Sequence, residues 1–294
     1  SFGGNQLNIS GFVLLGLSSS PEFQGPLFCV FLLMYLLSLL GNILIFFLIF
    51  SSSRLFHSPM YFFLSHLSLA DLGFSSTTVP KMLHNLVSRS NTISYSGCLT
   101  QMYFFVMFGT TDNFLLASMA YDRYVAICHP LHYASIMSYK CCHILASTSW
   151  FLSHVQSMLY LSCSDISSVE MLLVTEGTAT LLGPLLLILF SYTFIVFKVL
   201  KVPSTSGRYK AFSTCSSHLT TVAFFYGTLI STYIRPSSTY SDSRLKVASI
   251  FYSVVTPMLN PVIYSLRNRE MHGAIRTIQG GKIPLTFKCS LKFH

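Results

Sequence analysis

Seven long apolar runs constrain the fold of this chain more than any other feature of its sequence. Each is long enough to cross a bilayer as a helix, which takes about 20 residues. The runs lie near residues 26–50, 59–83, 98–121, 141–161, 171–198, 212–234 and 245–266. They are hydrophobic all round, whereas membrane β-strands alternate and run for only about 10 residues. The sequence therefore predicts an all-α bundle of seven transmembrane helices.

Composition supports a membrane protein, and the distribution of charge predicts its orientation. Only 9% of the 294 residues are charged, against about 25% in an ordinary soluble domain. Of the 18 Lys and Arg residues, 13 fall on the side opposite the N-terminus. Because cytoplasmic loops are enriched in Lys and Arg, we expect the N-terminus outside and the C-terminus inside. The net charge of +9 then reflects topology and anionic inner-leaflet lipid, not a nucleic-acid partner.

The chain divides into three expected segments. They are an extracellular tail over 1–25, the seven-transmembrane domain over 26–266, and a cytoplasmic amphipathic helix with a tail over 267–294. Asn8 begins a glycosylation sequon in the predicted extracellular tail. The absence of an internal repeat argues against many transporter folds, and no C-x-x-C pair indicates a metal site.

Four polar residues fall in the middle of the apolar runs. Asp71 and Asp112 are expected in the second and third helices, and Asn42 and Asn260 in the first and seventh. Intramembrane carboxylates default to functional hypotheses, and two close carboxylates share a proton or hold a cation such as sodium. The same residues also suit a hydrogen-bonded network that only holds the helices together. The sequence leaves both interpretations open.

The third run carries one continuous helical face. Its members recur at steps of three or four: Phe105, Gly109, Asp112, Leu116, Met119 and Arg123. This face extends for about 27 Å and would link an outer apolar pocket to an arginine at the inner edge. Asp122 stands beside Arg123, and adjacent helical residues do not face each other squarely. We therefore expect a loose pairing that holds Arg123 at rest and releases it to a partner.

Five sets of short motifs follow one another along nearly the whole chain. They are Gly41-Asn42; PMYFFL at 59–64 with LSLAD at 67–71; MAYDRYVAICHPLH at 119–132; KAFSTCSSH at 210–218 with FYG at 225–227; and PMLNPVIYSLRN at 257–268. Together they resemble the olfactory receptors, a branch of the rhodopsin-like G-protein-coupled receptors. One motif alone would be suggestive, whereas five in order indicate common ancestry.

The resemblance implies an odorant receptor and not an enzyme, with no catalytic residue and no cofactor besides the sodium considered above. A small volatile ligand would bind in the outer half of the bundle. The inner half would then activate a stimulatory, olfactory-type heterotrimeric G protein and raise cAMP. The implied location is the plasma membrane of sensory cilia. By position, the implied ligand-binding residues are Phe105, Val106, Gly109, Thr110, Glu176, Thr180, Tyr226, Ile230 and Tyr233.

The resemblance also implies a switch at the inner end of the bundle. Its residues are Asp122, Arg123, Tyr124, Tyr192, Asn260, Pro261 and Tyr264. The first three would contact or gate the G protein, and the two later tyrosines would brace the open state. The Asn-Pro pair weakens the seventh helix, because proline removes a helical hydrogen bond.

One departure from the family concerns the outer connection between the fourth and fifth helices. The family has a long loop there with several Cys, one of which bridges to a Cys at the start of the third helix. That Cys is present as Cys98, but the connection here is short and retains only Cys163. Cys98 is expected to pair with Cys163 or to stay reduced. Two hypotheses follow: a working odorant receptor with a shortened loop, or a receptor-derived product that misfolds, is retained in the cell and does not signal.

Overall fold

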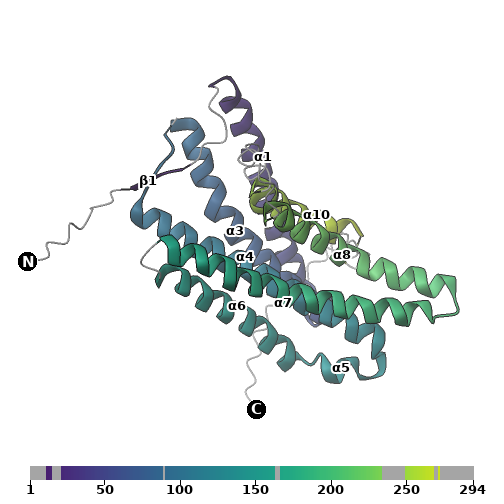
Figure 1. Cartoon of the computed structure of the whole chain (residues 1–294). Coiled ribbons are helices and arrows are strands. Elements are labelled where there is room, and N and C mark those ends of the chain that lie inside the picture. Colours follow the sequence, from purple (N-terminus) through teal and green to yellow (C-terminus); the bar gives the residue numbers. More distant parts are fainter. Residues whose placement is uncertain are drawn as a thin grey trace, which may run out of the picture.

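Long helices form almost all of the protein in a computed structural model of the whole chain (Figure 1). The structure describes residues 11–14, 21–88, 90–162, 166–233, 249–267 and 271. The long helices are α1 (Pro21–Ser51), α3 (Pro59–Ser88), α4 (Tyr95–Cys128), α6 (Tyr139–Ser162), α7 (Ile166–Leu200) and α8 (Thr205–Tyr233). The last segment combines a π-helical turn, η2 (Phe251–Val255), with α10 (Thr256–Arg267). Short connecting elements are α2 (Ser53–Phe56), η1 (Pro130–His132) and α5 (Tyr133–Ile136).

Each predicted span coincides with one long helical segment, which confirms the all-α seven-helix bundle. Several helices extend beyond their apolar runs. The 34 residues of α4 correspond to about 51 Å of helix, whereas the hydrocarbon core is about 30 Å thick. Two of the described helices, over Glu22–Ser51 and Gly177–Leu200, are apolar enough to be identified as spans by hydropathy alone. Others carry polar residues on buried faces, such as Ser68 and Asp71 of α3.

Helix α4 runs through the centre of the bundle. It packs against α3, α6 and α7, while α1 packs against α3 and α10. Gly41 permits the close approach of α1 to α10, because a Cβ atom at this position would lie 2.8 Å from Cβ of Pro261. On α6, the fully buried hydroxyls of Ser153 and Ser157 each donate to the carbonyl four residues earlier. These internal bonds satisfy both hydroxyls in the buried interior.

A two-stranded sheet ties the N-terminal segment to the connection between α3 and α4. Strand β1 (Gly11–Val13) pairs antiparallel with β2 (Thr92–Ser94). The ring of Phe12 stacks on that of Tyr95 with their centroids 6.0 Å apart. We name the end of the bundle that carries this sheet the outer end and the end that carries α5 the inner end, following the predicted orientation.

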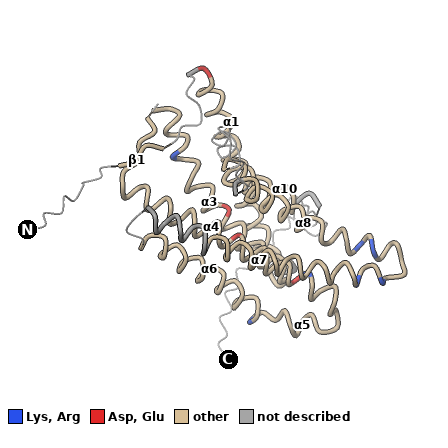
Figure 2. The backbone as a smooth tube through the Cα atoms, in the orientation of Figure 1, with Lys and Arg blue, Asp and Glu red and all other residues tan. Residues whose placement is uncertain are grey.

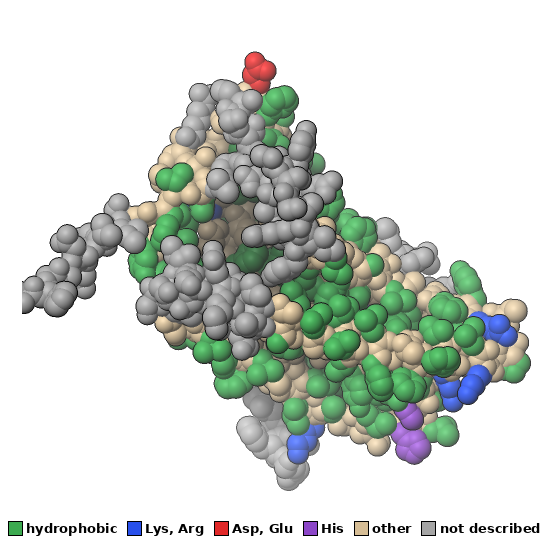
Figure 3. Space-filling view, in the orientation of Figure 1, with side chains coloured by type: hydrophobic (Ala, Val, Ile, Leu, Met, Phe, Trp, Pro, Cys, Tyr) green, Lys and Arg blue, Asp and Glu red, His purple; other side chains and the backbone are tan. Residues whose placement is uncertain are grey.

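The molecular surface separates apolar and charged side chains. Hydrophobic side chains cover much of the visible bundle around α7 (Figure 3). Most described Lys and Arg residues gather at the inner end, near α5 and the connection between α7 and α8 (Figure 2). Of the described acidic side chains, Asp71, Asp112 and Asp122 are buried, whereas Glu22 is exposed at the start of α1. Such a basic end is typical of a cytoplasmic side, and the orientation itself stays a prediction.

Several predictions fall outside the described residues. They concern the sequon at Asn8, the thiol of Cys163 and the amphipathic helix beyond residue 267, of which only Met271 is described. The division into 1–25, 26–266 and 267–294 therefore stays a prediction.

Candidate functional site

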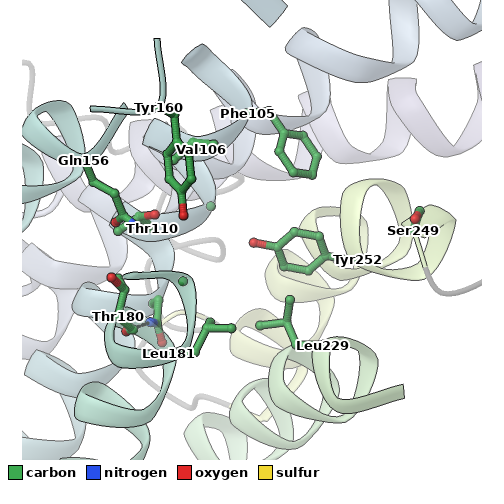
Figure 4. A pocket seen from close by; sticks show the side chains of 13 residues that line it. Phe105, Val106, Thr110, Gln156, Tyr160, Thr180, Leu181, Leu229, Ser249 and Tyr252 are labelled. Carbon is green, nitrogen blue, oxygen red and sulfur yellow. Dashed lines mark hydrogen bonds between the residues drawn. The ribbon is translucent and has the colours of Figure 1, made fainter. Parts of the chain in front are cut away.

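A cavity of about 270 Å3 opens between the helices in the outer half of the bundle. Helix α4 supplies one wall, and α6, α7, α8 and the segment around η2 supply the others (Figure 4). The lining residues are Phe105, Val106, Gly109, Thr110, Asn113, Gln156, Tyr160, Gly177, Thr180, Leu181, Leu229, Ser249 and Tyr252. None of these is charged, so the cavity offers apolar walls with a few hydroxyl and amide groups.

The structure brings most of the predicted ligand-binding residues to this cavity. Five of them line it: Phe105, Val106, Gly109, Thr110 and Thr180. Tyr226 is buried next to the lining and contacts Asn113. The side chains of Glu176 and Tyr233 lie outside the described part of the structure.

Ile230 departs from the prediction. Its side chain is 47% exposed and does not line the cavity. Leu229, one position earlier on α8, lines the wall in its place. Successive helical residues are rotated by about 100°, so a shift of one position moves a side chain off the inward face. We therefore replace Ile230 by Leu229 in the candidate pocket.

Some lining residues were missed although the sequence contained a signal for them. Asn113 follows Gly109 by four residues and shares its helical face. Gln156 and Tyr160 are likewise four residues apart, on one face of α6. Continuing the periodicity of α4 and applying it to α6 would have found all three.

Tyr252 was also missed, and no sequence signal identifies it. It belongs to the π-helical turn η2, and its ring packs edge-on against Phe74, Phe105 and Phe225. A Cβ atom at Gly109 would lie only 2.4 Å from Oη of Tyr252. The absence of a side chain at Gly109 therefore lets the tyrosine hydroxyl reach the wall of α4.

The cavity floor is held by a polar cluster that joins three helices. Asn113 Nδ2 donates to the backbone carbonyl of Thr180 at 2.8 Å, linking α4 to α7. The hydroxyl of Tyr226 on α8 donates to Asn113 Oδ1. A ligand that displaces Tyr226 or Asn113 would therefore break one or both of the bonds that join α7 and α8 to α4 here.

The four intramembrane polar residues are buried in the middle of the bundle. Asn42, Asp71, Asp112 and Asn260 are each at most 5% exposed. Asn260 Nδ2 donates to Asp71 Oδ2 at 2.9 Å, and Asn42 Nδ2 donates to the Pro257 carbonyl at 3.0 Å. These bonds join α10 to both α1 and α3, so the group forms at least part of the expected packing network.

The same group offers oxygen atoms of the kind that bind a hard cation. Among the described residues, one side-chain oxygen each of Asn42, Asp71, Asp112 and Asn260 is buried without a hydrogen-bond donor. Neither carboxylate forms an ion pair with a described basic side chain. Carboxylate and amide oxygens are the ligands that hard cations prefer. The donor set therefore fits a cation such as sodium.

At the inner end, Asp122 and Arg123 form an ion pair. Nε and Nη2 of Arg123 lie 3.0 and 2.6 Å from Oδ2 of Asp122. The carboxylate is fully buried, and 13% of the arginine side chain is exposed. The pairing is closer than the spacing argument predicted, because the long arginine side chain bends back so that two nitrogens meet one oxygen. Tyr133 of α5 occupies the other oxygen, with its hydroxyl 2.7 Å from Oδ1.

A second inner contact connects α4 with α7 and α8. His218 Nε2 lies 2.9 Å from the Leu116 carbonyl, and Tyr192 Oη lies 2.8 Å from His218 Nδ1. A carbonyl only accepts, so Nε2 carries the proton and Nδ1 accepts from the tyrosine. The predicted residue Tyr192 is thus linked to the central helix through a histidine that sequence reasoning missed.

The remaining predicted switch residues lie around these contacts. Tyr264 is 2% exposed within α10, next to Ile263, whose carbonyl accepts a bond from Ser217 of α8 at 3.2 Å. The hydroxyl of Tyr124 lies 3.1 Å from His129 Nε2. Pro261 faces Gly41, as described above. The structure places these residues at helix contacts, and their part in activation stays a prediction.

The outer connection between α6 and α7 is short. Only three residues separate Ser162, where α6 ends, from Ile166, where α7 begins. Cys98 at the outer end of α4 is a free thiol in the described structure, and its candidate partner Cys163 lies outside the described residues.

Comparison with known proteins gives the family of this bundle. Residues 41–264 match the 7 transmembrane receptor (rhodopsin family). The chain is 50% identical to olfactory receptor 1L6 of Homo sapiens, over 92% of this chain and 85% of the relative. It is 47% identical to olfactory receptor 1f45 of Rattus norvegicus, over 95% of this chain and 98% of the relative. The rat alignment extends over 307 positions, more than the 294 residues of this chain, so some residues of that relative have no counterpart here.

Comparison with solved structures supports the same fold. The bundle superimposes on squid rhodopsin with a TM-score of 0.77, covering 88% of this chain and 81% of that one at 16% sequence identity. Sequence motifs, family match and fold agree, and together they imply a multi-pass protein of the plasma membrane. The chain belongs to the olfactory receptors within the rhodopsin family of seven-transmembrane receptors.

Proposed function

We propose that this protein is an odorant receptor that binds a small ligand in the outer cavity and activates a stimulatory, olfactory-type G protein at its inner end, raising cAMP. The proposal rests on the path of α4, which extends from the outer cavity to the ion pair at the inner end. Its outer half lines the cavity through Phe105 and Gly109, and its inner half presents the buried Asp122–Arg123 pair. One rigid element thus touches both the ligand and the switch.

The cavity defines the chemistry of the proposed ligand. No charged side chain is among the described lining residues, which favours a neutral molecule because an isolated charge would be costly to bury there. Phe105, Val106 and Leu229 provide apolar contacts, whereas Thr110 and Gln156 provide hydroxyl and amide groups. A small neutral compound with one or two hydrogen-bonding groups fits these walls.

The inner end supplies a contact surface for the G protein. Leu131 of η1 is 94% exposed, the highest exposure among the large hydrophobic side chains described. Along the chain, Leu131 comes eight residues after Arg123 and two before Tyr133, whose hydroxyl bonds to Asp122. An exposed leucine at this point suits an apolar pocket on a partner, and release of Arg123 would provide a charged contact beside it.

We further propose that Asp71 and Asp112 bind sodium in the resting state, with Asn42 and Asn260 as neighbouring oxygen donors. The four buried oxygens without donors support this assignment. A ligand that binds only the folded protein stabilises it by about 1.4 kcal/mol at ten times its Kd. We expect sodium chloride, compared with choline chloride, to raise the unfolding temperature of the purified receptor, and Asp112→Asn to remove the difference. An equal effect of both salts would contradict the sodium site.

A second candidate is a retained product without signalling activity. The three-residue connection between α6 and α7 and the free thiol of Cys98 favour it. Loss of a native disulfide typically costs about 2–5 kcal/mol, which is comparable with the whole stability of many proteins. The first candidate instead requires delivery to the plasma membrane, in sensory cilia for an olfactory role.

The first experiment is surface staining of an N-terminally tagged chain in intact cells, with permeabilised cells as the control. Signal on intact cells supports an outside N-terminus and a tolerated short connection, and an odorant screen by cAMP then tests signalling. Signal only after permeabilisation supports the retained product. In that case, restoring a loop of family length between α6 and α7 should recover surface signal if the short connection is the cause.

A further inference from the structure

A second cavity, of about 240 Å3, lies at the inner end of the bundle, separate from the odorant cavity. It is enclosed by the start of α3, the connection that includes α2, the short helix α5 and the start of α6. No residue is shared between the linings of the two cavities. The inner cavity is therefore a distinct candidate site and not an extension of the first.

The described walls of this inner cavity are mainly aromatic, and His57 adds an imidazole ring. Phe56, Phe62, Tyr133 and Tyr139 contribute rings, and none of the lining residues is Asp, Glu, Lys or Arg. Ser58 and Ser138 add hydroxyl groups. Ring-lined walls favour a planar aromatic molecule through stacked and edge-on contacts, and the hydroxyls favour one that also carries a hydrogen-bonding group.

The inner cavity is directly connected to the ion pair of the switch. Tyr133 lines it and donates its hydroxyl to Asp122 Oδ1 at 2.7 Å. Asp122 in turn binds Arg123 through Oδ2. Burial, reinforced by the neighbouring Asp122 carboxylate, raises the pKa of Tyr133, so its hydroxyl stays protonated and remains a donor. A molecule packed against the Tyr133 ring would restrict the motion of this donor.

We propose that the inner cavity binds a small uncharged aromatic molecule with a hydrogen-bonding group, and that occupancy holds Tyr133 on Asp122 and lowers receptor signalling. The binding part stands on the cavity alone, and the signalling part rests on the proposed receptor function. The two parts are tested by separate measurements.

Binding is tested on the purified full chain through Cys142. This buried thiol lines the inner cavity, whereas the adjacent Cys141 does not and serves as an internal control. Phenol is the probe, and cyclohexanol is the matched non-aromatic compound. Peptide mass spectrometry then measures the rate at which iodoacetamide alkylates each thiol.

We expect phenol, at twice its Kd, to slow alkylation of Cys142 by about threefold, because bound protein is protected in proportion to occupancy. Cys141 should be unaffected, and cyclohexanol should protect Cys142 much less. Ala134 is an exposed position of the lining. Ala134→Trp should fill part of the cavity and slow the alkylation of Cys142 in the absence of phenol. Equal protection by both compounds overturns the aromatic assignment. No protection at saturation, or no reaction of Cys142 while Cys141 reacts, overturns the site.

Signalling is tested by basal nucleotide exchange on the G protein, with and without phenol. We expect phenol to lower exchange in the unaltered receptor. Tyr133→Phe keeps the ring but removes the bond to Asp122, so phenol should still protect Cys142 but no longer change exchange. An equal phenol effect in the variant overturns the role of Tyr133. Absence of all exchange contradicts the proposed function instead and leaves the alkylation result to decide the site.

Discussion

The outer and inner halves of α4 use polar groups in opposite ways. In the outer half, Thr110 lines a cavity whose walls leave room for a ligand. In the inner half, Asp122 is fully buried and both of its oxygens are occupied, by Arg123 and Tyr133. The outer half is thus arranged to admit a partner, whereas the inner half must break existing contacts before it can bind one. This difference predicts that outer substitutions change ligand potency and inner substitutions change the response to every ligand.

The largest expected effect is at the inner end. Arg123→Ala should abolish the cAMP response to any ligand while leaving the amount of receptor at the cell surface unchanged. The reason is that it removes the guanidinium that we expect to contact the G protein after release from Asp122. The exposed Lys140→Ala provides a matched control, since it removes a basic residue at the same end without breaking the pair. Cell-surface staining and cAMP are measured in the same cells. A retained response would contradict the assigned role of Arg123.

A smaller effect is expected in the outer cavity. Gly109→Ala places a Cβ atom 2.4 Å from Oη of Tyr252, so the tyrosine must move. We expect about a tenfold loss of ligand potency, equivalent to about 1.4 kcal/mol, with the maximal response preserved. Gly183→Ala is the control, because its Cβ atom meets nothing within 4 Å. Equal dose–response curves for the two variants would remove Tyr252 from the ligand site.

The exposed leucine of η1 separates G-protein contact from ligand binding. Leu131→Ala should reduce maximal G-protein activation several-fold, because a side chain that is 94% exposed loses only partner contacts when shortened. Ligand binding to the purified receptor in the absence of G protein should not change. If affinity falls while G-protein activation is kept, the division between an outer ligand site and an inner G-protein contact fails at this position.

The smallest expected effect concerns the cavity floor. Tyr226→Phe keeps the ring and removes the bond to Asn113. A single buried hydrogen bond contributes about 0.5–1.5 kcal/mol, so ligand potency should shift by a few-fold and the unfolding temperature should fall slightly. A dose–response curve identical to that of the unaltered receptor would show that the hydrogen bond between Tyr226 and Asn113 does not affect ligand binding.

The sequence predicted the features that depend on local patterns. Long apolar runs located all seven helical segments, since hydrophobicity over about 20 residues is sufficient to define a span. Helical periodicity placed Phe105, Gly109, Asp112 and Arg123 on one face of α4, and that periodicity extends to Asn113, which lines the cavity with the first two. Resemblance to the family supplied the pocket positions, of which Thr110 and Thr180 are in the lining.

Features that depend on how helices meet were not accessible from the sequence. Ile230 faces away from the cavity while Leu229 lines it, because the rotation of α8 is set by its neighbours and not by its own composition. In the same way, no pattern indicated that His218 would connect Tyr192 to the Leu116 carbonyl. Such contacts join residues far apart in the chain.

The amino-acid sequence by itself determined the membrane location, the seven helices and the residue types available at each level of the bundle. Only the tertiary structure decided which of these groups meet. It placed Tyr252 against Gly109 through a π-helical turn, and it brought Tyr133 from a connecting helix onto Asp122. The physical reason is that hydropathy and helical periodicity act within one segment, whereas cavities and switches are formed between segments by packing.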